Sequence, residues 1–295
     1  MNTPTLISIF FALCGVGILL SLVSPPSRQG SVLAWLGCLA SLALLLAGAS
    51  ALFAGNTFTQ PLWTLPGLAA TLTLKMDSLS AVFIFLTGLV LFPASIFAGS
   101  APASGAADDA LVVGTSADQQ TFSHESPART VPREGAPSGS PECFRGCAPQ
   151  SRAFTVFMFG LYASIALIFV AGDVVLFLLA WEVMSILCWL LIVCAREKEN
   201  DHAGSGYLLL AMGEAGTLAA ALGFLLLAVG AGSLDFGAIK SAASGLSVGV
   251  QWAVFLLSFF GFGVKAGLVP VNFWLPRAYV AAPRAFVPVL AGATL

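Results

Sequence analysis

Long apolar stretches recur along the chain and are separated by short polar segments. Each stretch is long enough to cross the ~30 Å hydrocarbon core of a bilayer as an α-helix of about 20 residues. The pattern predicts seven spans, over residues 5–24, 31–54, 78–98, 153–171, 174–194, 205–229 and 250–275. An eighth apolar segment begins near Arg284 and runs to Leu295. We therefore predict an all-α polytopic membrane protein with about seven complete transmembrane helices and the start of an eighth.

Composition supports a membrane protein. Of the 295 residues, 58% are hydrophobic and 9% are charged, whereas a soluble domain is about a quarter charged. Residues 1–23 lack the basic start and the small-residue cleavage site of a secretory signal, so we expect them to stay as the first helix. With so few surface charges, the net charge of −2 gives no indication of nucleic-acid binding. The expected surroundings are the lipid bilayer.

The distribution of basic residues predicts the orientation of the chain. With the N-terminus outside, nine of the twelve lysines and arginines fall in inner loops. Without the four in the long loop 99–152, the inner side still leads by five to two, and short loops weigh most in this rule. We therefore place the N-terminus outside.

Residues 99–152 differ in composition from the rest of the chain. They are rich in Gly, Pro, Ala and Ser and hold too few large apolar residues to offset the entropy of ordering. We predict a mostly disordered cytoplasmic insertion between a first unit, 1–98, with three helices and a second unit, 153–295. A docking segment for a soluble partner is one interpretation, and we favour a tolerated insertion.

Three ionisable residues lie well inside the predicted spans. Glu182 follows Asp173 by nine residues, which places it ~13 Å into the membrane, and Glu214 and Lys265 lie at comparable depth. Each charge at mid-membrane costs ~2.5–3.5 kcal/mol, so such residues face the interior of the bundle, pair with each other or line a wet path. A static Glu–Lys pair is the simpler interpretation. Three groups at one depth favour a path for protons or ions.

The flanks of Lys265 predict a discontinuous seventh helix. Three glycines nearby permit close approach of backbones, and Pro270 lacks the N–H that would bond the carbonyl of Ala266. A broken helix at membrane depth is tolerated where it is buried in protein or lines a water-filled cavity, and transporters use such breaks at ion sites. A plain proline kink is the alternative.

These residue types suit proton transfer and give no sign of a metal or cofactor. An ammonium and a buried carboxylate stabilise each other's charged form when they are close, so separating them releases a proton. The two histidines, His124 and His202, lie in predicted loops without a ligand cluster. Cys143 and Cys147 form a CxxxC that a zinc ion or a disulfide can use, but we favour free thiols because no further ligand is nearby.

Two segments together resemble a known family. "GDVVLFLLAWEVMSILCWLLIV", residues 172–193, is followed by "GFGVKAGLVPVNFWLPRAYVAAP", residues 261–283. They are similar to the antiporter-like membrane subunits: chains L, M and N of respiratory complex I, the Mrp antiporter subunits, and component B of hydrogenase-4 and formate hydrogenlyase. The resemblance extends from about Met76 to Leu295 without the loop 99–152. The pairing of WE in mid-helix with KAGLVPxxxWLP is specific.

The resemblance implies a proton-translocating subunit of a redox-driven complex in the cell inner (plasma) membrane, with no redox centre of its own. Its partners would be other membrane and peripheral subunits of that complex. By resemblance, Glu182 pairs with Lys265, Glu214 assists as a further acid, and the chain holds the first of two inverted five-helix repeats. We expect an inner path for protons lined by Pro270, Asn272, Trp274 and Tyr279.

The chain also departs from the family pattern. Relatives commonly carry histidines where this chain has Asn272 and Tyr279, and often an acid in place of Arg277, so candidate relays are missing. This variant favours a hydrogenase-4-like or divergent complex I-like branch. Because relatives carry a second repeat, we expect the chain to be an N-terminal fragment. Two alternatives stay open: an Mrp-type Na⁺/H⁺ antiporter subunit, and a truncated scaffold that does not conduct.

Overall fold

The computed structural model describes residues 2–65, 70–100, 151–193 and 202–294. Within these residues, seven helices are long and apolar enough to cross a membrane. They are α1 (Thr3–Val23), α2 (Gln29–Ala54), α3 (Ser78–Ser100), α5 (Arg152–Val170), α6 (Val174–Val193), α7 (His202–Ala231) and α9 (Val248–Lys265). The predicted class, a polytopic helical membrane protein with seven spans, is confirmed. Most of the predicted insertion 99–152, with His124, Cys143 and Cys147, lies outside the described residues.

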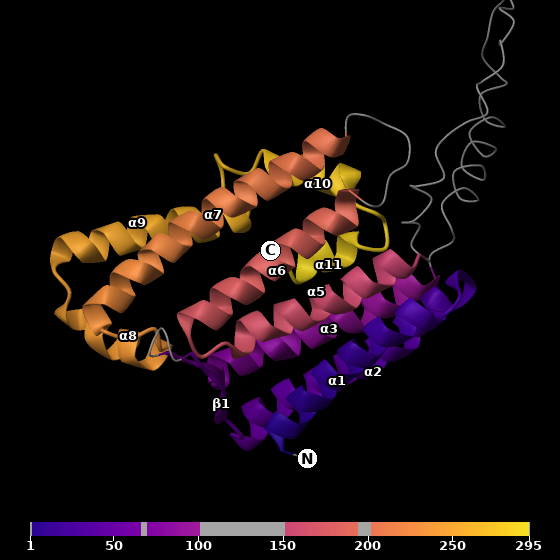
Figure 1. Ribbon diagram of the computed structural model, residues 1–295, viewed down its shortest axis with the longest axis horizontal. Helices are drawn as coiled ribbons and strands as arrows, with labels where there is room; N and C mark the ends of the chain where they lie inside the picture. Colours follow the sequence, from indigo (N-terminus) through magenta and orange to yellow (C-terminus); the bar gives the residue numbers. More distant parts are fainter. Residues whose placement is uncertain (1, 66–69, 101–150, 194–201, 295) are drawn as a thin grey trace, which may run out of the picture.

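The helices form a bundle with an attached pair (Figure 1). Helices α1, α2, α3 and α5 pack on one another, α6 packs on α5 and α7, and α9 packs along α7. The core of the bundle holds large side chains that are completely buried, among them Phe10, Phe154, Phe159 and Tyr162. Helix α9 in contrast buries Gly261, Gly263 and Val264, all near its C-terminal end. That end is therefore the part of α9 that the protein interior encloses.

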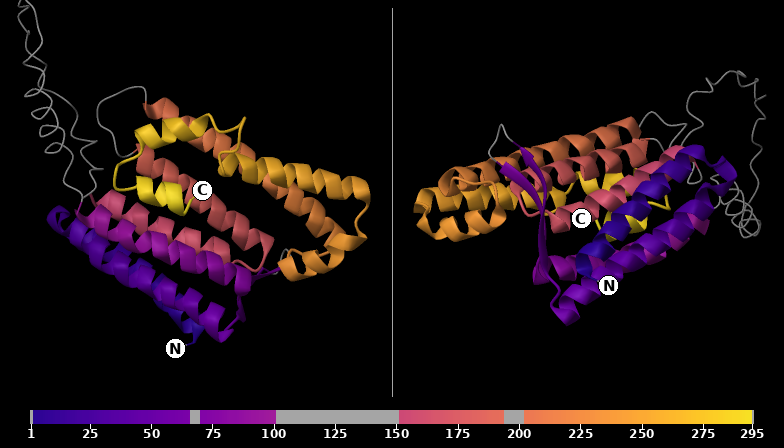
Figure 2. Two further views of the ribbon diagram at one scale, coloured as in Figure 1. Left: turned by 180° about the vertical axis from the view of Figure 1, so that it is seen from behind. Right: turned by 60° about the horizontal axis from the view of Figure 1, so that its bottom comes forward.

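A β-hairpin follows α2 and was not predicted from the sequence. Strand β1 (Phe58–Leu65) pairs antiparallel with β2 (Ala70–Met76), at the end of the bundle where α3 begins (Figure 2). The signal was present in "ATLTLKM", residues 70–76, where threonines and a lysine alternate with apolar residues. This two-residue period was hidden between long apolar runs that dominate the hydropathy pattern.

Asp173 fastens the start of α6 to this hairpin. One carboxylate oxygen accepts the backbone N–H of Thr73 and the other accepts that of Leu176, both at 2.8 Å. The second bond caps the N-terminus of α6, where a carboxylate is favourable. On the other side, the N–H of Val174 donates to the carbonyl of Leu234 at 3.0 Å. The position of α6 along the bundle axis, and with it the position of Glu182, is thereby fixed by hydrogen bonds to the hairpin and to Leu234.

Helix α9 ends at Lys265 in a glycine-dependent cap. Gly267 adopts a φ of +66°, and its N–H donates to the carbonyl of Val264 at 3.2 Å while that of Leu268 donates to Gly263 at 2.9 Å. This pair of bonds is the Schellman motif, in which a residue with positive φ turns the chain away from the helix axis. The carbonyls at the end of α9 are thus largely satisfied by the chain itself.

The discontinuous seventh helix is confirmed, but its position and cause differ from the prediction. The predicted span 250–275 is too long, because the helix has already ended when the chain reaches Pro270. The break comes from Gly267, and the proline lies in the non-helical connection that follows. The chain then continues into α10 (Trp274–Ala281) and α11 (Val287–Gly292), the latter at the predicted eighth segment.

Short helical elements complete the fold. They are α8 (Phe236–Ala242), which follows α7, and two 3₁₀ turns, η1 (Pro26–Arg28) and η3 (Ala243–Gly245). Asp235 caps α8 by accepting the N–H of Ala238 at 2.9 Å. The short helix α8 therefore turns the chain between the paired helices α7 and α9.

The cap of α9 makes a testable prediction. Gly267→Ala places a Cβ at positive φ and only 2.8 Å from Cδ2 of Leu275, so we expect the free energy of unfolding to fall by about 1–2 kcal/mol. Gly249→Ala, near the start of α9, is the control, because its Cβ would meet nothing within 4 Å. Thermal unfolding of the detergent-solubilised protein measures both, and equal loss of stability would contradict the cap.

Candidate functional site

The three ionisable residues predicted inside the membrane come together from three helices. Glu182 lies on α6, Glu214 on α7, and Lys265 is the last residue of α9. The carboxyl groups of Glu182 and Glu214 are neighbours, and both lie close enough to the ammonium of Lys265 to influence it electrostatically. A hydrogen bond between two carboxyl groups requires that one of them carries a proton. Two neighbouring carboxyl groups of this kind can share one proton.

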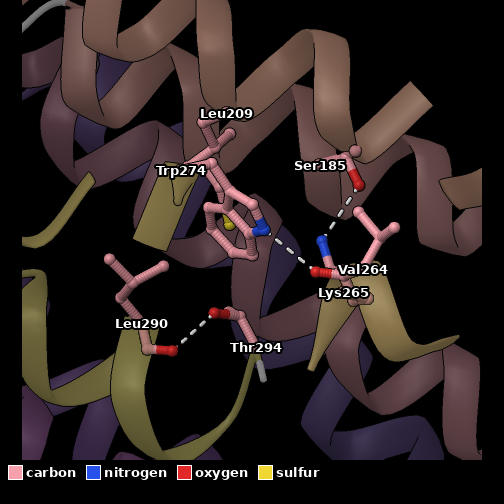
Figure 3. A pocket seen from close by; sticks show the side chains of 9 residues that line it. Ser185, Leu209, Val264, Lys265, Trp274, Leu290 and Thr294 are labelled. Atoms are coloured by element: carbon pink, nitrogen blue, oxygen red, sulfur yellow. Dashed lines mark hydrogen bonds between the residues drawn. The ribbon is translucent and has the colours of Figure 1, made fainter. Parts of the chain in front are cut away.

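The direct partner of Lys265 is a hydroxyl group. Its Nζ donates to Oγ of Ser185 at 3.1 Å, and the two side chains point toward one another (Figure 3). Within the described residues, neither carboxyl makes a direct ion pair with the ammonium. Oε1 of Glu182 is buried there without a hydrogen-bond partner. The ammonium of Lys265 is thus bonded to Ser185, which lies one turn after Glu182 on α6.

The end of α9 also favours a positive charge. Lys265 lies in the last turn, where the aligned peptide dipoles present partial negative charge. Such an interaction stabilises a cation by about 0.3–1 kcal/mol in exposed positions and by more in partly buried ones. It offsets part of the cost of placing an ammonium at membrane depth.

Small residues bring α7 and α9 into backbone contact beside the cluster. A Cβ added to Gly261 would lie 2.6 Å from the carbonyl oxygen of Gly216 and 2.8 Å from the backbone nitrogen of Ala220. Close contacts between small residues are a common way for membrane helices to associate. Glu214 precedes Gly216 by two residues and Lys265 follows Gly261 by one turn. The close approach therefore fixes the two charged residues at similar height; close backbone approach was predicted for Gly261 but not for Gly216.

A cavity of about 20 Å³ adjoins Lys265 (Figure 3). Its polar lining comes from Lys265, Ser185, Thr294 and the thiol of Cys188, and its remaining lining is largely apolar. A cavity of this size has room for one water molecule, which needs two to four polar partners. The three oxygen- and nitrogen-bearing side chains can supply them. The cavity is thus suited to a single water in contact with the ammonium.

The four residues predicted to line an inner path lie in different surroundings. Trp274 is buried, lines the cavity, and donates from Nε1 to the carbonyl of Val264 at 3.0 Å. Pro270 is exposed, and Asn272 and Tyr279 are partly exposed. These three are not among the residues that line the cavity. Trp274 forms part of the cavity wall. A proton path through the other three residues stays a prediction.

Sequence reasoning missed Ser185, Cys188 and Thr294. Ser185 follows Glu182 by three residues, so the helical period alone puts both on one face of α6, and Cys188 continues that face. Thr294 follows α11, and its hydroxyl donates to the carbonyl of Leu290 at 2.8 Å. Its approach to Lys265 depends on the turn between α9 and α11, which no periodicity predicts.

Comparison with known proteins places this arrangement in a family. Residues 171–295, which include Glu182, Glu214 and Lys265, match the family described as "NADH:quinone oxidoreductase/Mrp antiporter, TM". Hydrogenase-4 component B of Escherichia coli (strain K12) is 31% identical over 223 residues, 76% of this chain and 26% of that protein. NADH-quinone oxidoreductase subunit N of Deinococcus radiodurans is 32% identical over 120 residues, 40% of this chain and 24% of that protein.

A solved structure shows the same fold. A chain in the structure of the Mrp complex from Dietzia sp. DQ12-45-1b superimposes with a TM-score of 0.65 at 17% identity, over 97% of this chain and 46% of that chain. Residues 171–295 thus carry a domain of the antiporter-like family, and the chain as a whole has the fold of an Mrp complex chain. It spans about a quarter of the length of the curated relatives and about half of the matching structure.

The contact between α7 and α9 makes a second prediction. Gly261→Ala drives a Cβ into backbone atoms of Gly216 and Ala220 that no rotamer change can move. We expect the two helices to separate and the stability to fall by about 1–3 kcal/mol. Gly15→Ala, on α1, is the control, because its Cβ would meet nothing within 4 Å.

Two spin labels report the separation directly. They can be placed at the exposed positions Leu222 on α7 and Phe255 on α9. The distance between the labels should increase in Gly261→Ala and stay unchanged in Gly15→Ala. An unchanged distance and stability in Gly261→Ala would rule out a rigid backbone contact.

Proposed function

We propose that this chain conducts protons across the membrane through Lys265 and Glu182, assisted by Glu214, as a subunit of a redox-driven complex. The observation that carries the proposal is the meeting of two carboxyl groups and one ammonium from three helices. They meet beside a cavity that fits one water, at the end of an interrupted helix. Charges at this depth are costly unless they are paired, hydrated or used in transport.

The geometry supports a transfer step controlled by distance. The ammonium now lies one turn of α6 from the free oxygen of Glu182. Contact with that carboxylate would stabilise the protonated lysine, while separation removes this stabilisation. The N–H bond of the lysine can then break, and its proton passes to water in the adjoining cavity. The neutral amine regains a proton from Glu182 when the two groups meet again, and Glu214 can return one to Glu182 because their carboxyl groups are neighbours.

Partner subunits would supply the energy for transport. The names of the relatives, a component of hydrogenase-4 and a subunit of NADH-quinone oxidoreductase, support a complex in which redox chemistry takes place in other chains. The distribution of basic residues supports an orientation with the N-terminus outside. We place the chain in the cell inner membrane, with membrane and peripheral partners.

The fold shared with an Mrp complex chain favours one alternative, a Na⁺/H⁺ antiporter subunit. The site itself argues for protons, because the ammonium of Lys265 borders the cavity and repels a metal cation. Sodium uptake into vesicles, measured with and without a proton gradient, separates the two functions. Proton flux that requires sodium would favour the antiporter.

The proposed centre predicts the effect of removing either charge. In vesicles that contain the assembled complex with the full-length chain, Lys265→Met and Glu182→Gln should each reduce proton flux at least about tenfold, because one charged partner is lost. Glu214→Gln should have a smaller effect. Lys240→Met is the matched control, since Lys240 is exposed on α8, and it should leave flux unchanged. Full flux in both Lys265→Met and Glu182→Gln would refute the centre.

A further inference from the structure

Ser185 differs from the other buried serines in the helices. The hydroxyl groups of those serines donate to a carbonyl three or four residues earlier in their own helix; they are Ser21, Ser41, Ser95 and Ser164. Ser185 is 2% exposed, and in the described part of the chain its hydroxyl makes no such bond. It accepts a hydrogen bond from the ammonium of Lys265 instead. The side chain is thus turned away from its own backbone and toward the site.

Lys265 faces two acceptors that lie one turn apart on α6. Ser185 and Glu182 are three residues apart, which puts them on one face of the helix and about 4.5 Å apart along its axis. The hydroxyl of Ser185 is bonded to the ammonium, while Oε1 of Glu182 is buried without a partner. A lysine side chain has four rotatable bonds, so rotamer changes alone can move its ammonium by several ångströms.

We propose that Ser185 is a positioning residue that holds Lys265 apart from Glu182 while the lysine gives up its proton. The inference rests on the proposed function. A hydroxyl group can accept a hydrogen bond from an ammonium and can donate one to a neutral amine. Ser185 therefore binds Lys265 in both protonation states, whereas a carboxylate favours the charged state alone. The released proton passes from Nζ to a water in the cavity that both residues line.

The experiment compares two variants of nearly equal volume. Ser185→Thr keeps the hydroxyl and Ser185→Val replaces it with a methyl group. In vesicles with the assembled complex, flux per assembled complex should stay close to wild type in Ser185→Thr and fall about tenfold in Ser185→Val, because a hydrogen bond to a charged group is lost. Ser164→Thr and Ser164→Val, on α5, form the control pair and should not differ from each other, because that hydroxyl bonds, within the described residues, to the carbonyl of Leu161 in its own helix.

An infrared measurement distinguishes positioning from packing. The infrared band of the Glu182 carboxyl group is identified by its loss in Glu182→Gln. Without the Ser185 hydroxyl the ammonium should rest at Glu182, so this band should shift in Ser185→Val and not in Ser185→Thr. Equal flux in the two Ser185 variants, at any level, or an unshifted band in Ser185→Val, would overturn the inference. Such a result together with loss of flux in Lys265→Met leaves the proposed function standing. Full flux in Lys265→Met and Glu182→Gln would remove both.

Discussion

The cost of a charge in a medium of low dielectric constant governs this structure. A chain with 9% charged residues holds three ionisable side chains within helices long enough to cross a membrane, and a charge left alone at mid-membrane costs ~2.5–3.5 kcal/mol. The fold meets this cost by bringing them to one place. Two carboxyl groups lie near one ammonium, the ammonium sits at the negative end of a helix dipole, and a water-sized cavity adjoins it.

The neighbouring elements are arranged so that these groups meet with little freedom. Asp173 fixes the height of α6 by capping it and by accepting an N–H from the hairpin. Gly216 and Gly261 allow α7 and α9 to touch through their backbones. Gly267 ends α9 directly after Lys265, and Trp274 then folds back to bond the carbonyl of Val264. In this setting Lys265 has two available partners, Ser185 and Glu182, and its movement is the step on which transport would depend.

Hydropathy and helical period were sufficient for much of this arrangement. The predicted spans agree with the helices to within a few residues, apart from the seventh, while the membrane depth of Glu182, Glu214 and Lys265 stays a prediction from counting residues along them. The β-hairpin was not predicted because a short segment with a two-residue period gives a weak signal beside long apolar runs. The sequence named both the nearby glycines and Pro270 as causes of the break in α9, and the backbone conformation of Gly267, which no sequence pattern shows, sets its position. Thr294 and the cavity depend on the turn between two helices, which single-segment patterns do not contain.

The central claim is that Lys265 exchanges its proton with a water held between Ser185 and Thr294. An experimental density map of the assembled complex, at a resolution that shows ordered waters, tests this most directly. The account predicts density for one water within hydrogen-bonding distance of Nζ of Lys265, with the ammonium between Ser185 and Glu182. A lysine side chain that faces lipid, or a cavity closed by apolar side chains, would contradict it.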